Sequence, residues 1–155
     1  MVSGYPVPCC PALVVRNLVA STLWYEAGLG FRLIFSNAGT ADDEPQLTHL
    51  RWGNHSNLVL TPDDPQVALA GARGLGVTLR FQVAGSVDAL AEQVKSYGIE
   101  ILLGPLDRPW KAREFVVADP DGYHLAFTGR MLGELPLEMA AEAELIETKA
   151  VVSAV

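Results

Sequence analysis

Hydrophobic and polar positions alternate along much of the chain with a period of about 2, typical of strands, and two longer segments change to the helical spacing of about 3.6. In the first half, residues 11–16 (PALVVR) predict a short buried strand. The next segment predicts a helix with Asn17 as its N-cap or directly before the N-cap, ending at Gly28 and Gly30, because Asn favours helix starts and Gly favours helix ends. Three more strands are expected, at 31–36, 47–52 and 57–62.

The second half shows the same order of elements. Residues 77–83 alternate as a strand, and residues 86–98 predict an amphipathic helix capped by Ser86 and ended by Gly98. The remaining elements are a strand at 99–104, a loop at 105–112, and two strands at 113–118 and 123–128 that flank the turn Asp-Pro-Asp-Gly.

The two halves keep a nearly constant offset. Gly30 at the end of the first helix corresponds to Gly98 at the end of the second, and 98 − 30 = 68. Leu58 after the first hairpin corresponds to Leu125 after the second, and 125 − 58 = 67. This agreement predicts an internal repeat of one strand–helix–strand–strand–strand module.

These landmarks predict one α+β domain over residues 1–130, with module one at 10–61 and module two at 77–128. The last segment, 131–155, is rich in Ala, Glu and Leu and predicts a C-terminal helical tail outside the repeat. The pattern leaves open whether this tail packs across a subunit boundary.

Three stretches carry a family resemblance: STLWYEAGLGF, SVDALAEQVKSYGIEI and RPWKAREFVVADPDGYHLAF. Their sequences and their order resemble the glyoxalase/bleomycin-resistance/extradiol-dioxygenase superfamily, also called vicinal oxygen chelate proteins, over residues 10–128. The resemblance implies two βαβββ modules that form a curved mixed sheet around a ligand cavity. It also implies that the modules pair either within one chain or across a homodimer.

The resemblance also indicates where a metal would bind. Enzymes of this superfamily hold a divalent ion with four side chains, usually His or Glu, one from the first and one from the last strand of each module. The corresponding residues here are Cys10, Val59, Thr78 and Ala126. Only the Cys10 thiolate is a plausible ligand, and one ligand does not hold a catalytic ion. The resemblance therefore implies the metal-free, bleomycin-resistance-like branch, with no metal, no other cofactor and no catalytic residue.

The overall charge narrows the range of partners. The chain has 18 acidic and 11 basic residues and a net charge of −7. This balance argues against nucleic acid and favours a cationic ligand. No apolar run approaches the roughly 20 residues of a membrane span, and no signal peptide is evident. The adjacent Cys9 and Cys10 are the only cysteines, which suits a reducing cytoplasm.

Alternation assigns residues of module two to the cavity face. Thr78, Arg80 and Gln82 lie on one side of their strand, opposite an apolar side that suits helix packing. Arg80 could bind a ligand anion, although an ion pair with Glu114 is favoured. His124 is expected on the cavity face of the last strand, as a ligand contact or as a histidine satisfied by a neighbour.

Two tryptophans are candidates for stacking on a planar ligand. Trp110 lies in the loop before the strand at 113–118, and Trp52 ends a strand beside the first hairpin turn. Either ring could instead close the edge of the core. Asp119 and Asp121 form no catalytic pair, because Asp, Pro and Gly at these positions are explained by a type I turn.

The sequence thus predicts a metal-independent protein that sequesters a small organic ligand, cationic or aromatic, in the cytoplasm and forms a homodimer. The alternative is a metal-dependent lyase, isomerase or dioxygenase with an atypical site at His124 and either His49 or Cys10. A third hypothesis is a regulatory module whose C-terminal tail binds a partner protein.

Overall fold

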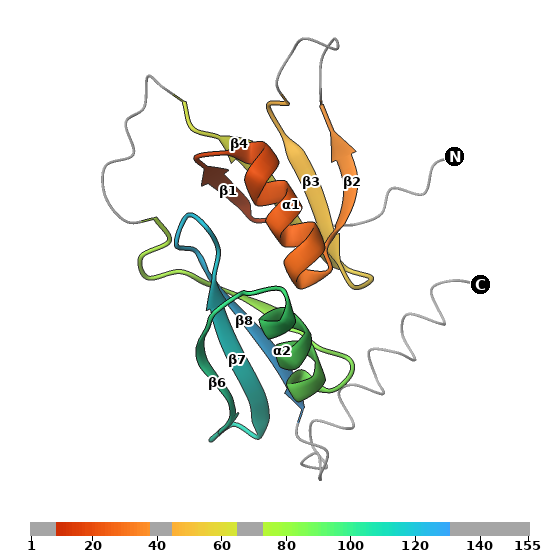
Figure 1. Ribbon diagram of the computed structural model, residues 1–155, viewed down its shortest axis with the longest axis vertical. Helices are drawn as coiled ribbons and strands as arrows, with labels where there is room; N and C mark the ends of the chain where they lie inside the picture. The colour runs from red at the N-terminus through yellow and green to blue at the C-terminus, as the bar shows by residue number, and fades with distance from the viewer. Residues whose placement is uncertain (1–8, 38–44, 65–72, 131–155) are drawn as a thin grey trace, which may run out of the picture.

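The computed structural model of the chain describes residues 9–37, 45–64 and 73–130 (Figure 1). The predicted helix in 131–155 lies outside the described residues. Within the described ranges, no helix is long and apolar enough to cross a membrane.

Module one forms a four-stranded sheet with one helix. Its elements are β1 (Ala12–Val15), α1 (Leu18–Leu29), β2 (Arg32–Ser36), β3 (Thr48–Trp52) and β4 (Ser56–Pro62). The strand order is β1-β4-β3-β2, with β1 parallel to β4 and the other pairs antiparallel.

Module two has the same architecture. Its elements are β5 (Thr78–Gln82), α2 (Val87–Ser96), β6 (Ile101–Arg108), β7 (Ala112–Ala118) and β8 (His124–Arg130). The strand order is β5-β8-β7-β6, and only the β5–β8 pair is parallel. The predicted α+β fold of two βαβββ modules is confirmed.

The register of the parallel pairs reproduces the repeat. Ala12 pairs with Val59 in module one, and Arg80 pairs with Ala126 in module two. The offsets are 80 − 12 = 68 and 126 − 59 = 67, the same values that the sequence indicates. Equivalent residues of the two modules therefore occupy equivalent places in their sheets.

Local capping explains the helix boundaries. Asn17 Oδ1 accepts a hydrogen bond from the Ala20 amide at 2.9 Å, and Ser86 Oγ accepts one from the Ala89 amide at 3.2 Å. Helix α1 ends at Gly30, whose φ of 75° is in the left-handed region that glycine favours. The predicted roles of Asn17, Ser86 and Gly30 are confirmed, whereas Gly28, also predicted to end the first helix, lies inside α1.

The prediction of a loop over 105–112 is wrong in part, because β6 continues to Arg108. After two register shifts, Leu106 pairs with Glu114 and Arg108 pairs with Ala112 of β7. The proline in this segment is typical of a loop, but a bulged strand can hold a residue that has no amide donor.

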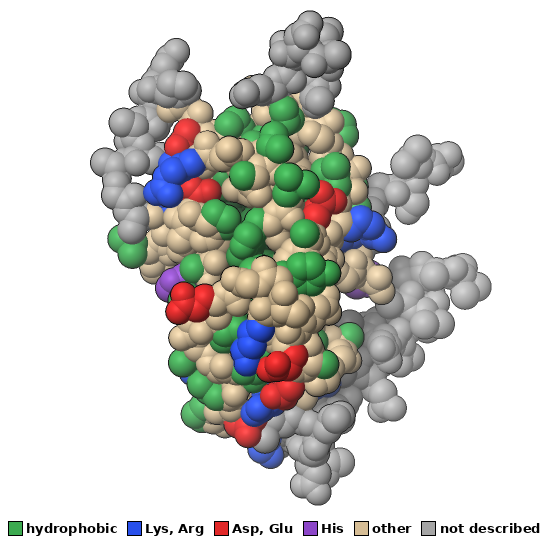
Figure 2. Space-filling view, viewed as in Figure 1, with side chains coloured by type: hydrophobic (Ala, Val, Ile, Leu, Met, Phe, Trp, Pro, Cys, Tyr) green, Lys and Arg blue, Asp and Glu red, His purple; other side chains and the backbone are tan. Residues whose placement is uncertain are grey.

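The two modules share one hydrophobic core. Phe31 of module one makes an edge contact with Phe81 of module two, with ring centroids 5.3 Å apart. Trp52 of module one lies 5.3 Å from Phe127 of module two. Both helices lie on the same side of their sheets (Figure 1), the side that Figure 2 presents to the viewer. The opposite sides of both sheets, which we call the open face, therefore point away from the core.

The Asp-Pro-Asp-Gly turn also joins the modules. The Tyr25 hydroxyl of α1 donates a hydrogen bond to Asp119 Oδ2 at 2.9 Å, and Asp119 Oδ1 accepts the amides of Asp121 and Tyr123. Burial raises the pKa of the Asp119 carboxyl, and it also raises the pKa of the Tyr25 hydroxyl. The turn interpretation holds, but Asp119 also binds the first module.

Asp121 makes a second connection. Its carboxylate accepts the Arg16 amide at 3.1 Å and lies 3.3 Å from the Arg73 guanidinium. Arg73 also donates to the Val14 carbonyl at 2.8 Å and pairs with Asp63. The ends of β1 and β4 are thereby bound to the β7–β8 turn.

Candidate ligand-binding face

The open face of module two carries a buried carboxylate between two arginines. Glu114 of β7 is only 1% exposed in its side chain. Its Oε1 accepts hydrogen bonds from Arg108 Nε at 2.9 Å and Nη2 at 2.7 Å, and its Oε2 accepts one from Arg80 Nη1. The favoured prediction of an Arg80–Glu114 pair is confirmed.

A small residue on β8 makes room for this pair. Strand β8 lies between β5 and β7, so the Arg80 side chain must cross β8 to reach Glu114. Arg80 is directly beside Ala126, and Ala126 is completely buried on this face. A longer side chain at Ala126 would occupy the path of the guanidinium.

Trp110 lies against both guanidinium groups. The Arg80 Cζ atom is 5.7 Å from the Trp110 ring centroid, and the Arg108 Cζ atom is 5.5 Å from it. These distances are typical of cation–π contacts. Trp110 is nevertheless 57% exposed. We call Glu114, Arg80, Arg108 and Trp110 the Glu114 cluster.

The other predicted residues of module two lie on the same face. Thr78 pairs with His124, and both side chains are exposed at one end of the parallel β5–β8 pair. Gln82 pairs with Thr128 at the other end. The structure thus brings Thr78, Arg80, Gln82 and His124 onto one surface, in the order that alternation predicts.

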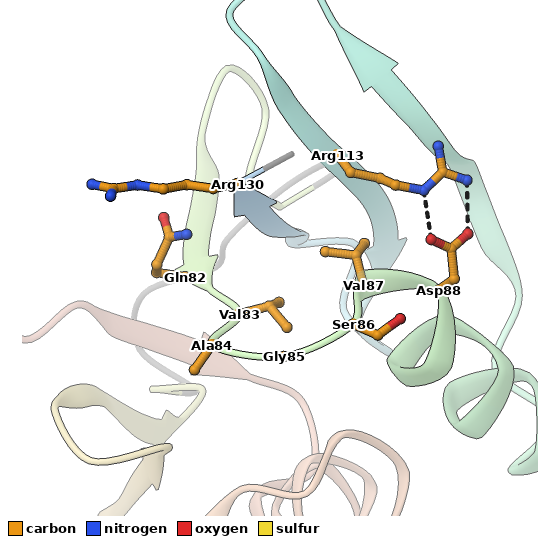
Figure 3. A pocket seen from close by; sticks show the side chains of 9 residues that line it. All are labelled: Gln82, Val83, Ala84, Gly85, Ser86, Val87, Asp88, Arg113 and Arg130. Atoms are coloured by element: carbon orange, nitrogen blue, oxygen red, sulfur yellow. Dashed lines mark hydrogen bonds and ion pairs between the residues drawn. The ribbon is translucent and has the colours of Figure 1, made fainter. Parts of the chain in front are cut away.

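Gln82 also borders a pocket of about 560 Å³ at the start of α2. Figure 3 shows Gln82 beside Arg130, while Arg113 turns away from them toward Asp88. Arg113 donates to both carboxylate oxygens of Asp88, at 2.6 and 2.7 Å, and to Asp107 at 2.8 Å. The charge of Arg113 is therefore already balanced on the helix side of the sheet.

Trp52 does not share the open face with Trp110. Its ring packs on Phe81 and Phe127, and its Nε1 donates to the Leu29 carbonyl at 3.0 Å. Of the two readings of Trp52, the structure supports a core residue between the modules. Its aromatic character suits both readings, so the sequence alone did not separate them.

Module one contributes a polar cluster that sequence reasoning missed. Asn57 is nearly buried, and its Oδ1 lies 2.9 Å from His49 Nε2 and 3.0 Å from Arg51 Nε. Arg108 of module two was also missed, because it was assigned to a loop. Strand alternation around the buried Leu50 and Leu58 could have identified the first cluster.

The residues at the metal-ligand positions do not fit a metal ion. Val59 and Ala126 have no donor atom, and Ala126 lies beside Arg80. Burial and the neighbouring Cys9 raise the pKa of the Cys10 thiol, which disfavours the thiolate. Among the described residues, no three His, Cys, Asp or Glu side chains are grouped to hold a metal.

The sequence matches the model of the Glyoxalase/Bleomycin resistance protein/Dioxygenase superfamily over residues 10–127, and the chain belongs to this superfamily. TioX from Micromonospora sp. ML1 has a similar structure, with a TM-score of 0.64 and 21% identity over 78% of this chain and 96% of that one. A glyoxalase/bleomycin resistance protein/dioxygenase from Nocardioides has a TM-score of 0.62 and 25% identity, covering 88% of this chain and 90% of that one. A virulence protein from Salmonella typhimurium has a TM-score of 0.59 and 19% identity, covering 84% and 99%. No curated protein matches the sequence.

Proposed function

We propose that this chain is a metal-independent binding protein that captures a small aromatic molecule on the open face. The observation that carries the proposal is Trp110, a ring that is more than half exposed and stands on two arginine side chains. Aromatic rings in such positions stack on planar ligands. The donor-free side chains of Val59 and Ala126 support a mechanism without a metal.

On this proposal the protein acts by stoichiometric capture. The ligand stacks on Trp110, and Thr78, Gln82 and His124 offer hydrogen bonds around it. Sequestration of this kind in the cytoplasm lowers the free concentration of a toxic compound, such as an antibiotic, without converting it.

The proposal includes a homodimer that covers the open face. Phe35 pairs with His49 on this face and is 54% exposed, and Leu103 pairs with Val116 and is also exposed. Exposed apolar side chains beside a binding surface are typical of an interface. A second copy of the chain would turn the open face into a cavity.

The test is a titration of the full chain with a panel of aromatic compounds, including bleomycin, followed by tryptophan fluorescence. A saturable change is expected for at least one compound, and it should persist after dialysis against EDTA. The change should be lost in Trp110→Phe and kept in the matched control Trp24→Phe, since Trp24 lies on α1 on the other side of the sheet. The absence of a response across the panel would refute the proposal.

The metal-dependent alternative predicts a different result. It requires a stoichiometric ion in the purified protein, measured by elemental analysis, that is lost in His124→Ala. It also requires that EDTA abolish binding.

A further inference from the structure

The charged residues of the strands are divided between the two sides of the sheets. Arg113 and Asp107 pair with each other on the helix side, where Arg113 also contacts Asp88 of α2. The other charged residues of the described strands lie on the open face: Arg32, Arg51, Arg80, Arg108, Glu114 and Arg130. These side chains sum to 5 − 1 = +4.

Register and alternation support this assignment. Arg51 donates a hydrogen bond to Asn57 on the side of the sheet opposite the buried Leu50. Arg32 is the direct cross-strand partner of Arg51 and therefore lies on the same side. Arg130 alternates along β8 with Thr128 and projects beside Gln82 (Figure 3). The strands of the open face are therefore cationic, in a chain whose net charge is −7.

On the helix-bearing side, ion pairs hold several of the acidic side chains. Over α2, Glu92 contacts Lys95 at 2.9 Å and Asp88 holds Arg113, so red and blue side chains adjoin in Figure 2. The Glu114 cluster differs, because two arginines share one carboxylate. Counted over the part of the chain that the structure describes, this cluster has one positive charge more than its carboxylate balances.

We infer that the ligand of the open face is a planar anion, such as an aromatic carboxylate. This inference rests on the proposed function and adds the charge of the ligand. Among the described residues, Arg80 bonds Glu114 through Nη1 and Arg108 bonds it through Nε and Nη2. The remaining N–H groups of both guanidiniums are donors for an anionic oxygen, at the edge of a ring that stacks on Trp110.

The inference reverses the expectation from net charge. A charge of −7 favours a cation only if the acidic groups surround the site. Glu114 is the single carboxylate among the described strand residues of the open face, and both of its oxygens are occupied. A cation on Trp110 would face Arg80 and Arg108, which repel it.

The experiment compares three probes of nearly equal shape: 2-naphthoate, 2-naphthamide and 2-naphthylmethylammonium. Each is titrated into the full chain by isothermal titration calorimetry near neutral pH. We expect 2-naphthoate to bind about tenfold more tightly than the amide, because guanidinium–carboxylate bonds are charge-assisted. Raising NaCl from about 50 to about 500 mM should weaken the naphthoate complex and leave the amide complex nearly unchanged.

Single variants test which arginines cause the preference for naphthoate over the amide. Arg80→Gln and Arg108→Gln should each reduce the naphthoate-to-amide ratio several-fold, and each leaves Glu114 with one arginine partner. Arg130→Gln lowers the charge of the face without contacting Glu114 and should reduce the ratio less. Arg113→Gln is the matched control on the other side of β7, and its ratio should equal that of the unmodified chain.

The outcomes separate the two proposals. If the amide or the ammonium probe binds as tightly as naphthoate, the anion inference is overturned and the capture function stands. Equal ratios in Arg80→Gln, Arg108→Gln and Arg113→Gln would overturn the assignment to the Glu114 cluster. If none of these probes and no compound of the aromatic panel binds, both proposals fail.

Discussion

Gly104→Ala should be the most damaging single methyl addition beside the Glu114 cluster. The Gly104 φ is 85°, and a Cβ atom there would lie 2.3 Å from the Glu114 carbonyl oxygen. The positive φ alone costs an alanine about 1–2 kcal/mol. The contact with backbone forces β6 away from β7, and overpacking of this kind costs about 1–3 kcal/mol. We expect a loss of about 2–5 kcal/mol in the free energy of unfolding, the sum of the backbone cost and the overpacking cost.

The control for Gly104→Ala is Gly53→Ala in the β3–β4 turn. Gly53 also has a positive φ, 58°, but its added Cβ would meet nothing within 4 Å. Its cost should be the backbone term alone, about 1 kcal/mol. Thermal unfolding followed by circular dichroism should show a fall of roughly 10 °C for Gly104→Ala and a few degrees for Gly53→Ala. Equal effects of the two variants would refute the close-approach argument.

Three further variants test other parts of the structure. Asp119→Asn should change the pH dependence of stability, because burial raises the folded-state pKa of Asp119 and the wild type therefore loses stability as pH rises from the unfolded pKa through the folded one. Urea denaturation should show the variant gaining stability relative to the wild type as pH rises through this range, and a pH-independent difference would contradict the assignment. Ala126→Glu should destabilise the fold by about 1–3 kcal/mol, because a larger side chain does not fit this buried position. It should also weaken naphthoate binding, because the new carboxylate competes with Glu114 for Arg80. An unchanged dissociation constant for naphthoate in calorimetry would disprove that the Arg80 side chain crosses β8. Phe35→Glu should shift the mass in light scattering from dimer to monomer, whereas Val19→Glu, equally exposed but on α1, should not; identical masses would argue against an interface on the open face.

The fold could be predicted from the sequence because its signals are local and repeated. Asn17 and Ser86 cap helices through their own side chains. Because the offset between the modules is nearly constant, each element predicted in one module is supported by its counterpart in the other. The prediction was wrong at β6, where a proline suggested a loop but pairing with β7 continues to Arg108. That pairing depends on a partner strand, and local sequence does not report it.

The candidate site could be predicted only for residues placed by alternation. The alternation of β5 places Arg80 on the open face, where an ion pair with Glu114 could be predicted. Trp52 was a candidate because of its ring, and only tertiary packing on Phe127 assigns it to the core. The turn residue Asp119 shows the opposite case, since its contact with Tyr25 comes from a helix far away in the chain.

Composition gives the net charge of the chain but not where on the molecule the charges lie. The net value of −7 sums over all sides of the molecule, whereas the described strands direct five arginines and one glutamate to a single face. The sign that a ligand meets is therefore decided by strand register. A slip of one residue in β5 would send Arg80 into the core and Phe81 to the surface.

The shared core has a consequence for how the chain folds. Phe31 meets Phe81 and Trp52 meets Phe127 across the boundary between the modules, so neither half encloses its own aromatic side chains. Each half made alone would expose these rings and lose the Tyr25–Asp119 bond. The two modules therefore share a fold but are not independent folding units. They should unfold together in one cooperative transition.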